Sequence, residues 1–151
     1  MKKFLILLLA FMLIAGTAIA APVNKAIISA TTLDDSPTSV TSSTANIQDY
    51  DEVGFWVNYD ETEVGGGVSA AVTLDISYDG TTWLDANFYD LAGGTTLQTS
   101  ETISADGWYY CTLPILYNPA GTILYVRMVV AGTGTDTDDT ILVTVYLTGT
   151  K

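Results

Sequence analysis

Apolar side chains alternate with their neighbours along four stretches of this chain, and this period of two restricts its fold more than any other feature. Valine, isoleucine, tyrosine and phenylalanine dominate these stretches, which are residues 53–59, 72–78, 124–130 and 141–147. Successive side chains of an extended chain point to opposite faces, so alternation is typical of a strand with one buried face. The four stretches are therefore predicted to be half-buried β-strands.

Shorter strand candidates and turn sequences fill the remaining chain. The candidates are residues 23–31, 83–86, 98–103 and 107–113, and glycine-containing turns such as Asp79-Gly80 lie between several of the candidate strands. No helical period follows the first twenty residues. About eight strands joined by turns predict an all-β fold, an antiparallel β-sandwich with jelly-roll-like connectivity. An immunoglobulin-like strand order is the alternative.

The first twenty residues have the three parts of a secretory signal peptide. Lys2 and Lys3 precede a long apolar run, and Ala18-Ile19-Ala20 supplies small residues before a cleavage site. We expect a signal-peptide helix over residues 1–20, cleavage before Ala21, and a secreted or cell-surface protein with no membrane contact after cleavage. The alternative is an uncleaved helix, either in a membrane or in a filament core.

The mature chain is predicted to begin with an arm and to continue as one domain over residues 47–151. The arm, residues 21–46, joins an apolar stretch to a tether rich in serine and threonine. Such a strand can pair with the sheet edge of a neighbouring subunit. Alternatively, it folds back as an edge strand of its own sandwich.

Charge and composition argue against several classes of function. The chain carries 17 acidic and 5 basic residues, for a formal net charge of −12, so we expect no binding to nucleic acid. It contains no histidine, which removes the usual general base and the usual partner of a nucleophile. Its single cysteine, Cys111, is expected to be buried on a strand. We therefore predict that the protein is not an enzyme.

Calcium is the only cofactor that the sequence suggests. Asp136, Asp138 and Asp139 cluster within a few residues, and calcium takes several loop oxygens as ligands. The alternative is a solvated, acidic loop.

Aromatic residues on the outward faces of strands are the candidate ligand-binding residues. They are Trp56, Trp108, Tyr125 and Tyr146. Exposed aromatic side chains on a sheet often mark a contact surface, although a loop can also cover them. Self-association or binding to a surface glycan is the predicted partnership.

The sharpest local motif is Ser77-Tyr78-Asp79-Gly80-Thr81-Thr82-Trp83. Asp79-Gly80 favours a tight hairpin because glycine accepts a positive φ, and Trp83 is expected to return to the core. The motif resembles the Asp-box hairpin of sialidase-type propellers, but it lacks one residue between Asp79 and Gly80. This resemblance is local and implies no sialidase chemistry.

A longer resemblance covers residues 72–149. Three features follow one another along this region: the Asp-Gly-Thr-Thr-Trp turn, the Tyr125-Val126-Arg127 strand and an apolar closing strand. Their order resembles that in small β-sandwich modules of tailed-phage virions. Such modules decorate capsids, tails or fibres, and some bind glycans. The resemblance implies a structural protein of a surface layer, filament or virion-like particle. A carbohydrate-binding module or adhesin is the alternative.

Overall fold

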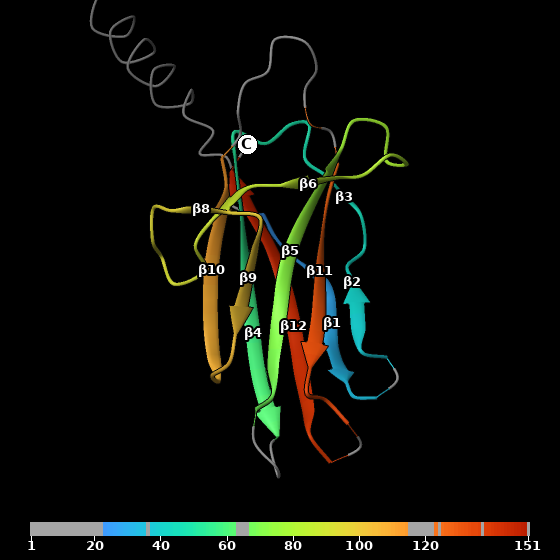
Figure 1. Cartoon of the computed structure of the whole chain (residues 1–151). Helices are drawn as coiled ribbons and strands as arrows, with labels where there is room; N and C mark the ends of the chain where they lie inside the picture. Colours follow the sequence, from blue (N-terminus) through green and yellow to red (C-terminus); the bar gives the residue numbers. More distant parts are fainter. Residues whose placement is uncertain are drawn as a thin grey trace, which may run out of the picture.

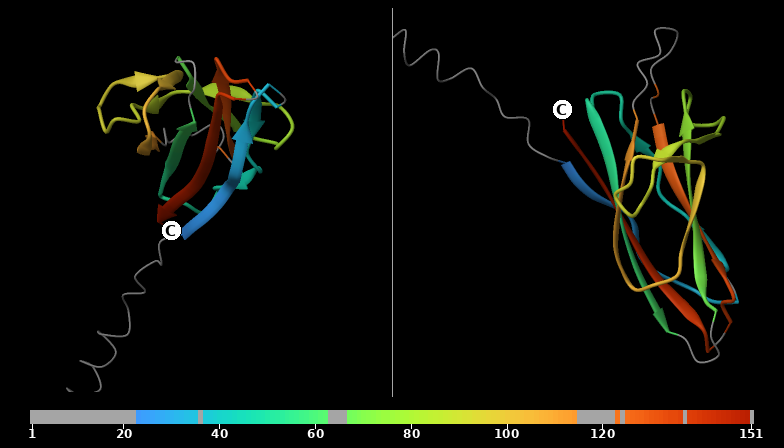
Figure 2. Two further views of the ribbon diagram at one scale, coloured as in Figure 1. Left: turned by 90° about the horizontal axis from the view of Figure 1, so that it is seen from below. Right: turned by 60° about the vertical axis from the view of Figure 1, so that its left-hand side comes forward.

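Two antiparallel sheets pack face to face in the computed structural model (Figures 1 and 2), which describes residues 23–35, 37–62, 67–114, 123, 125–136 and 138–150. The first sheet has the order β1 (Val23–Leu33), β12 (Thr140–Thr150), β4 (Glu52–Thr62) and β10 (Gly107–Leu113). The second has the order β2 (Ser39–Thr41), β11 (Tyr125–Thr133), β5 (Ser69–Ser77) and β6 (Leu84–Ala86), with β3 (Ala45–Asn46) on β11 and β9 (Ser100–Ile103) on β5. A small hairpin joins β7 (Phe88–Tyr89) to β8 (Leu97–Gln98).

The core lies between the two sheets and follows from the alternation of the strands. In β4, Val53, Phe55 and Val57 are fully buried, and in β11 Val126 and Met128 are fully buried. These residues belong to one continuous apolar cluster that draws on both sheets. Each long strand therefore presents one face to the core and its other face outward, which confirms the predicted antiparallel β-sandwich.

Within the described residues, the four long alternating stretches predicted from the sequence lie on β4, β5, β11 and β12, except for Tyr78, which follows β5. The stretch at residues 107–113 matches β10 residue for residue. The predicted signal peptide over residues 1–20 lies outside the described residues. No helix in the described part of the chain is long and apolar enough to cross a membrane.

Strands β1, β2 and β3 of the predicted arm, residues 21–46, belong to the sandwich, as in the alternative in which this segment folds back on its own domain. Strand β1 pairs with β12 from Val23↔Gly149 to Leu33↔Ile141, and the two strands lie side by side in both views of Figure 2. Ile28 and Leu33 of β1 are buried in the shared core. The polar segment after β1 also supplies β2 and β3, so the sandwich begins at β1.

Other segments of the chain contact both edges of the first sheet. At the β1 edge, the backbone amide of Ser43 donates to the carbonyl oxygen of Ile27 at 3.0 Å, and the pairing with β12 is interrupted by two register shifts. At the β10 edge, the backbone amide of Tyr110 donates to the carbonyl oxygen of Leu91 at 3.2 Å. Covered and irregular edges resist the addition of a foreign strand.

Candidate functional site: an aromatic sheet face

Aromatic side chains gather on the outer face of the first sheet. Tyr110 of β10 is the register partner of Trp56 in β4, and Trp56 is the register partner of Tyr146 in β12. These three residues form one row across neighbouring strands, and directly opposed side chains in a sheet lie close enough to interact. Trp108 lies two residues before Tyr110 on the same face of β10. We call these four residues, Trp56, Trp108, Tyr110 and Tyr146, the aromatic face.

The rings of the aromatic face form two contacting pairs. The centroids of Trp56 and Tyr110 are 4.6 Å apart with their planes tilted by 36°. Those of Trp108 and Tyr146 are 6.0 Å apart with a tilt of 33°. Trp108 nevertheless remains 57% exposed and Trp56 remains 41% exposed. The rings support one another and still leave aromatic surface in contact with solvent.

Three of these rings line an open groove together with the side chain of Asn24 from β1. The groove is bordered by Trp56, Trp108 and Tyr146 and has a volume of about 480 Å³. This volume falls within the range of small-ligand sites, about 300–1,000 Å³. The groove thus combines aromatic walls with one amide that can both donate and accept hydrogen bonds.

Tyr110 was not among the residues singled out from the sequence. Its ring lies across Gly54 of β4, where an added Cβ would come within 2.8 Å of the ring carbon Cε2. Burial, followed by the negative charge of Glu52, raises the pKa of Tyr110 and keeps its hydroxyl protonated. The alternation of β10 could have identified Tyr110 as an outward-facing aromatic residue, because Tyr110 lies two positions from Trp108 on the same face of the strand.

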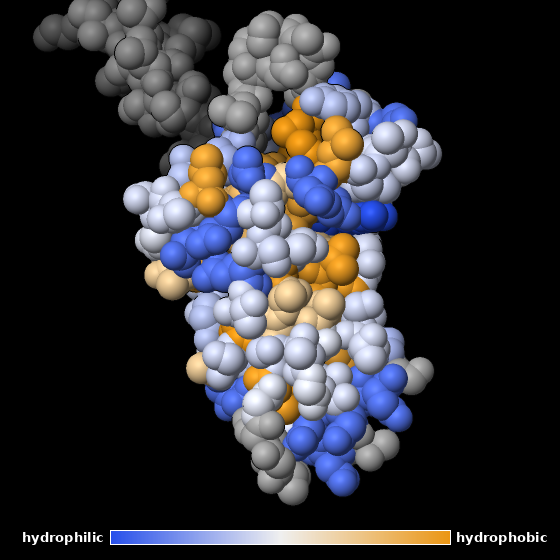
Figure 3. Space-filling view, viewed as in Figure 1, coloured by the Kyte–Doolittle hydropathy of each residue, from blue (hydrophilic) through white to orange (hydrophobic). Residues whose placement is uncertain are grey.

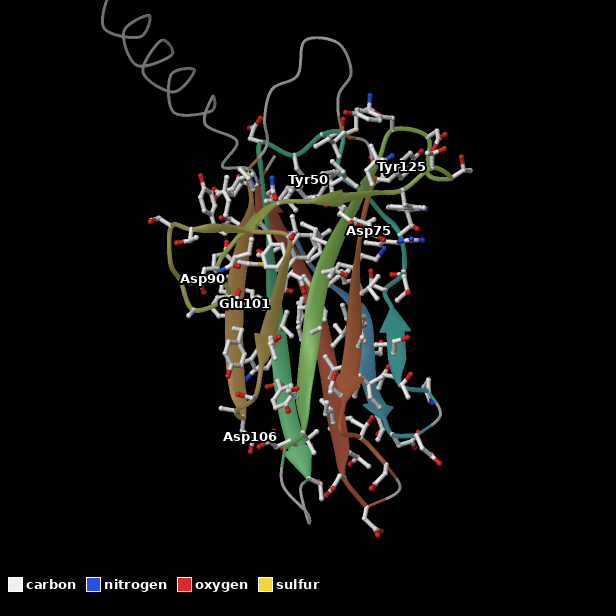
Figure 4. The ribbon with its side chains drawn as sticks, in the orientation of Figure 1. Tyr50, Asp75, Asp90, Glu101, Asp106 and Tyr125 are labelled. Atoms are coloured by element: carbon white, nitrogen blue, oxygen red, sulfur yellow. The ribbon has the colours of Figure 1, made fainter. Side chains whose placement is uncertain are left out.

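The fourth aromatic candidate, Tyr125, lies on the second sheet and takes no part in this face. It belongs to β11 and is half-buried, and its ring approaches Gly80 of the β5–β6 turn. Figure 4 shows Tyr125 near Asp75 at one end of the second sheet. Figure 3 shows hydrophilic and apolar side chains mixed over this side of the molecule. Tyr125 therefore packs against the hairpin.

The Asp79 hairpin is closed by its own carboxylate. Asp79 Oδ1 accepts the backbone amides of Thr81 at 2.8 Å and Thr82 at 2.7 Å, and Gly80 has a φ of +75°. The amides of Thr82 and Thr81, in that order, hold the pKa of Asp79 well below its ordinary value. Asp79 and Gly80 thus have a structural role in this turn.

The prediction that Trp83 returns to the core is wrong. Trp83 is half-buried, and the guanidinium carbon of Arg127 lies 4.2 Å from the centre of its ring. Arg127 Nε also donates to Asp75 Oδ2 at 2.8 Å. A cation held over an aromatic ring stabilises the pair, so Trp83 ties the hairpin to the outer face of β11.

The acidic loop predicted as a calcium site uses a carboxylate to close its own turn. Asp136 Oδ1 accepts the backbone amides of Asp138 at 2.8 Å and Asp139 at 2.9 Å, and these bonds lower the pKa of Asp136. Within the described ranges, no three acidic or cysteine side chains are grouped so that they could hold a metal ion. The described geometry therefore gives calcium binding at this loop no support.

A carboxyl pair that the sequence did not reveal holds the loop between β7 and β8 (Figure 4). The backbone amide of Leu91 donates to Glu101 Oε2 at 2.6 Å, and the Glu101 carboxyl shares a hydrogen bond with Asp90. Burial, followed by the bond and charge of Asp90, raises the pKa of Glu101 despite the opposing effect of the Leu91 amide. Paired glycosidase carboxyls stand about 5 Å or more apart across a cleft, so this pair fits a structural role better.

Cys111 is buried in the core at 1% exposure. Burial, followed by the negative charge of Glu101, raises the pKa of its thiol to about 12. The thiol is therefore protonated and shielded at neutral pH, as expected of a structural cysteine.

Comparison with known proteins reveals a shared fold. No family model and no curated protein matches the chain. The structure is similar to the crystal structure of SPBc2 prophage-derived protein YomS, with a TM-score of 0.52 and 10% sequence identity over 87% of this chain and 96% of that one. A structure of infectious bursal disease virus, Gx strain, aligns with a TM-score of 0.40 and 10% identity over 86% of this chain and 32% of that one. At 10% identity, the likeness to YomS shows the β-sandwich fold alone.

Proposed function

We propose that this chain is a secreted, non-catalytic structural protein of a surface layer, filament or virion-like particle, and that it attaches to its partner through the aromatic face. The observation that carries the proposal is the row of Trp56, Tyr110 and Tyr146 on a sheet whose two edges already contact other segments of the chain. Because the edges resist strand addition, contact through a sheet face is the better route to a partner.

The strand order supports this proposal. In the order β1-β12-β4-β10 facing β2-β11-β5-β6, the chain changes sheet from β1 to β2, from β4 to β5 and from β10 to β11, which supports jelly-roll-like connectivity. Viral capsid domains and lectins are both built on jelly rolls. A fold shared with a prophage-derived protein fits the same interpretation. Fold alone does not decide function, so the proposal rests on the aromatic face.

A non-catalytic role is consistent with the chemistry of the described side chains. The shielded thiol of Cys111 is a poor nucleophile, and the carboxyls of Asp79, Asp136 and Glu101 hold backbone amides of their own loops. A carboxylate already satisfied by backbone donors is poorly placed to move a proton in a reaction.

The test compares the mature chain, residues 21–151, with Trp56→Ala and Trp108→Ala. Size-exclusion chromatography with light scattering, together with electron microscopy, should reveal oligomers or particles that both substitutions weaken. The proposal fails if the wild-type protein stays monomeric at high concentration, or if it assembles equally well without the two rings. Mass spectrometry of the exported protein should find a chain beginning at Ala21, and an intact Met1 would contradict secretion by cleavage.

A carbohydrate-binding module or adhesin is the second candidate, and the groove beside Asn24 favours it specifically. In this role the protein would attach to a glycan of a surface and would not need to contact copies of itself.

A further inference from the structure

We infer that the ligand of the aromatic face is a neutral glycan chain, an inference that builds on the proposed role of this face in attachment. The occupant is identified by four properties of the face: the arrangement of its rings, its polar neighbours, its charge and its area.

The ring arrangement suits sugar stacking. Trp108 and Tyr146 come from strands on either side of β4, and their centroids are 6.0 Å apart with a tilt of 33°. The two tilted rings form a shallow concave surface, and the groove that they line with Trp56 is open to solvent. The electron-rich face of an aromatic ring attracts the polarised C–H bonds that a pyranose presents on its apolar side.

Uncharged polar side chains surround the rings. Asn24 lines the groove itself, and Asn58 and Thr144 form the register pair next to the pair Trp56–Tyr146. Amide and hydroxyl groups both donate and accept hydrogen bonds, which suits the hydroxyl groups of a sugar. The rings would supply affinity and these groups would orient the chain.

The charge around the face argues for a neutral ligand. Along the outward side of β4, Glu52 and Asp60 each stand four residues from Trp56. Of the two basic residues in the described chain, Arg127 belongs to the second sheet, and Lys25 has the opposite strand parity to the groove residue Asn24. A polyanion would be repelled from this surface, whereas a neutral glycan would not.

The aromatic area is small for a stable protein interface. With exposures of 41% and 57%, and about 250 Å² for a whole tryptophan side chain, Trp56 and Trp108 together offer roughly 250 Å². A stable protein partner buries about 800 Å² on each side. This area is enough to stack one or two sugar rings, whereas a protein partner would need further surface around the two rings.

The experiment is affinity electrophoresis of residues 21–151 in gels that contain a soluble neutral polysaccharide (a β-glucan, a xylan or a mannan), with an acidic polygalacturonate as the charge control. At least one neutral polysaccharide should retard the protein, with little dependence on salt, and polygalacturonate should not. Trp108→Ala and Trp56→Ala should each weaken binding at least tenfold. Trp83→Ala is the matched control, because Trp83 lies on the opposite sheet.

The outcomes separate this inference from the proposed function. If no neutral polysaccharide binds, or if Trp108→Ala binds as well as Trp83→Ala, a glycan ligand is ruled out. If no neutral polysaccharide binds but Trp108→Ala abolishes assembly, the aromatic face is a protein interface and the proposed function stands. Binding of a polysaccharide by a protein that remains monomeric would support the glycan and reject assembly. A shift of tryptophan fluorescence on titration of the wild-type protein tests binding without any substitution.

Discussion

The strand β1 should be essential to the fold, and Leu33→Ala is the sharpest test. Leu33 is fully buried at the end of β1, opposite Ile141 of β12. Replacing a buried leucine with alanine removes transfer free energy and leaves a cavity, which costs about 2–5 kcal/mol. A domain of this size is stable by about 5–15 kcal/mol, so the loss is a large share of the total.

Urea unfolding of residues 21–151, followed by circular dichroism, measures this effect. With an m-value of about 2 kcal/mol/M, the midpoint should fall by roughly 1–2.5 M. Thr32→Ala is the matched control, since Thr32 is the exposed neighbour of Leu33 on the same strand, and it should cost less than about 1 kcal/mol. Deleting residues 21–41 removes all of β1 and β2, including Ile28 and Leu33 from the core, and should leave a chain without cooperative unfolding.

Two results would refute this reasoning. One is a Leu33→Ala midpoint indistinguishable from that of Thr32→Ala, which would mean that β1 does not pack on the core. The other is a truncated chain that still unfolds cooperatively, which would return residues 21–41 to the role of a separable arm.

Four further predictions concern the hairpin and the thiol. Gly80→Val should lower the free energy of unfolding by at least about 1 kcal/mol, because a β-branched residue resists the φ of +75°. Gly80→Asn should lower it by less. Equal losses for the two variants would show that backbone strain is not the cause. Asp79→Asn should destabilise the protein at neutral pH, because the pKa of Asp79 is lowered in the folded state and its carboxylate therefore stabilises the fold above the unfolded-state pKa. This stabilisation is lost on protonation, so the difference from wild type should shrink as the pH falls below about 4. A pH-independent difference in urea titrations would contradict this. Trp83→Ala should cost about 1–2 kcal/mol in the same titration, since the half-buried ring mainly contacts Arg127, and a loss near 4 kcal/mol would place the ring in the core after all. Cys111 should react with a thiol reagent only after unfolding, and rapid labelling of the native protein would disprove its burial.

Local sequence predicted the strands and their faces because both follow from a period of two that needs no knowledge of the partner strand. The outward orientation of Trp56, Trp108 and Tyr146 was deduced in this way, and the structure agrees. The turn at Asp79-Gly80 was also predictable, since its hydrogen bonds join residues within three positions of one another.

Long-range pairing was not predictable, and it decides the rest of the structure. The strands β2 and β3 lie in a segment whose composition is typical of a polar tether. In the structure, the backbone amide of Ser42 donates to the carbonyl oxygen of Met128, and the amide of Met128 donates to Ser42 Oγ, although the two residues lie far apart along the chain. Similarly, the exposure of Trp83 depends on Arg127 of a distant strand.

One part of the aromatic face was predictable from the sequence, and the other part was decided by the tertiary structure. Alternation alone determined that its residues point outward from their strands. That Tyr110, Trp56 and Tyr146 stand in one row depends on β10 and β12 flanking β4 in a given register, and neither neighbour is adjacent to β4 in sequence. A period of two is a local property of the backbone, whereas strand order and register are set by the packing of the whole core, so only the tertiary structure could assemble this surface.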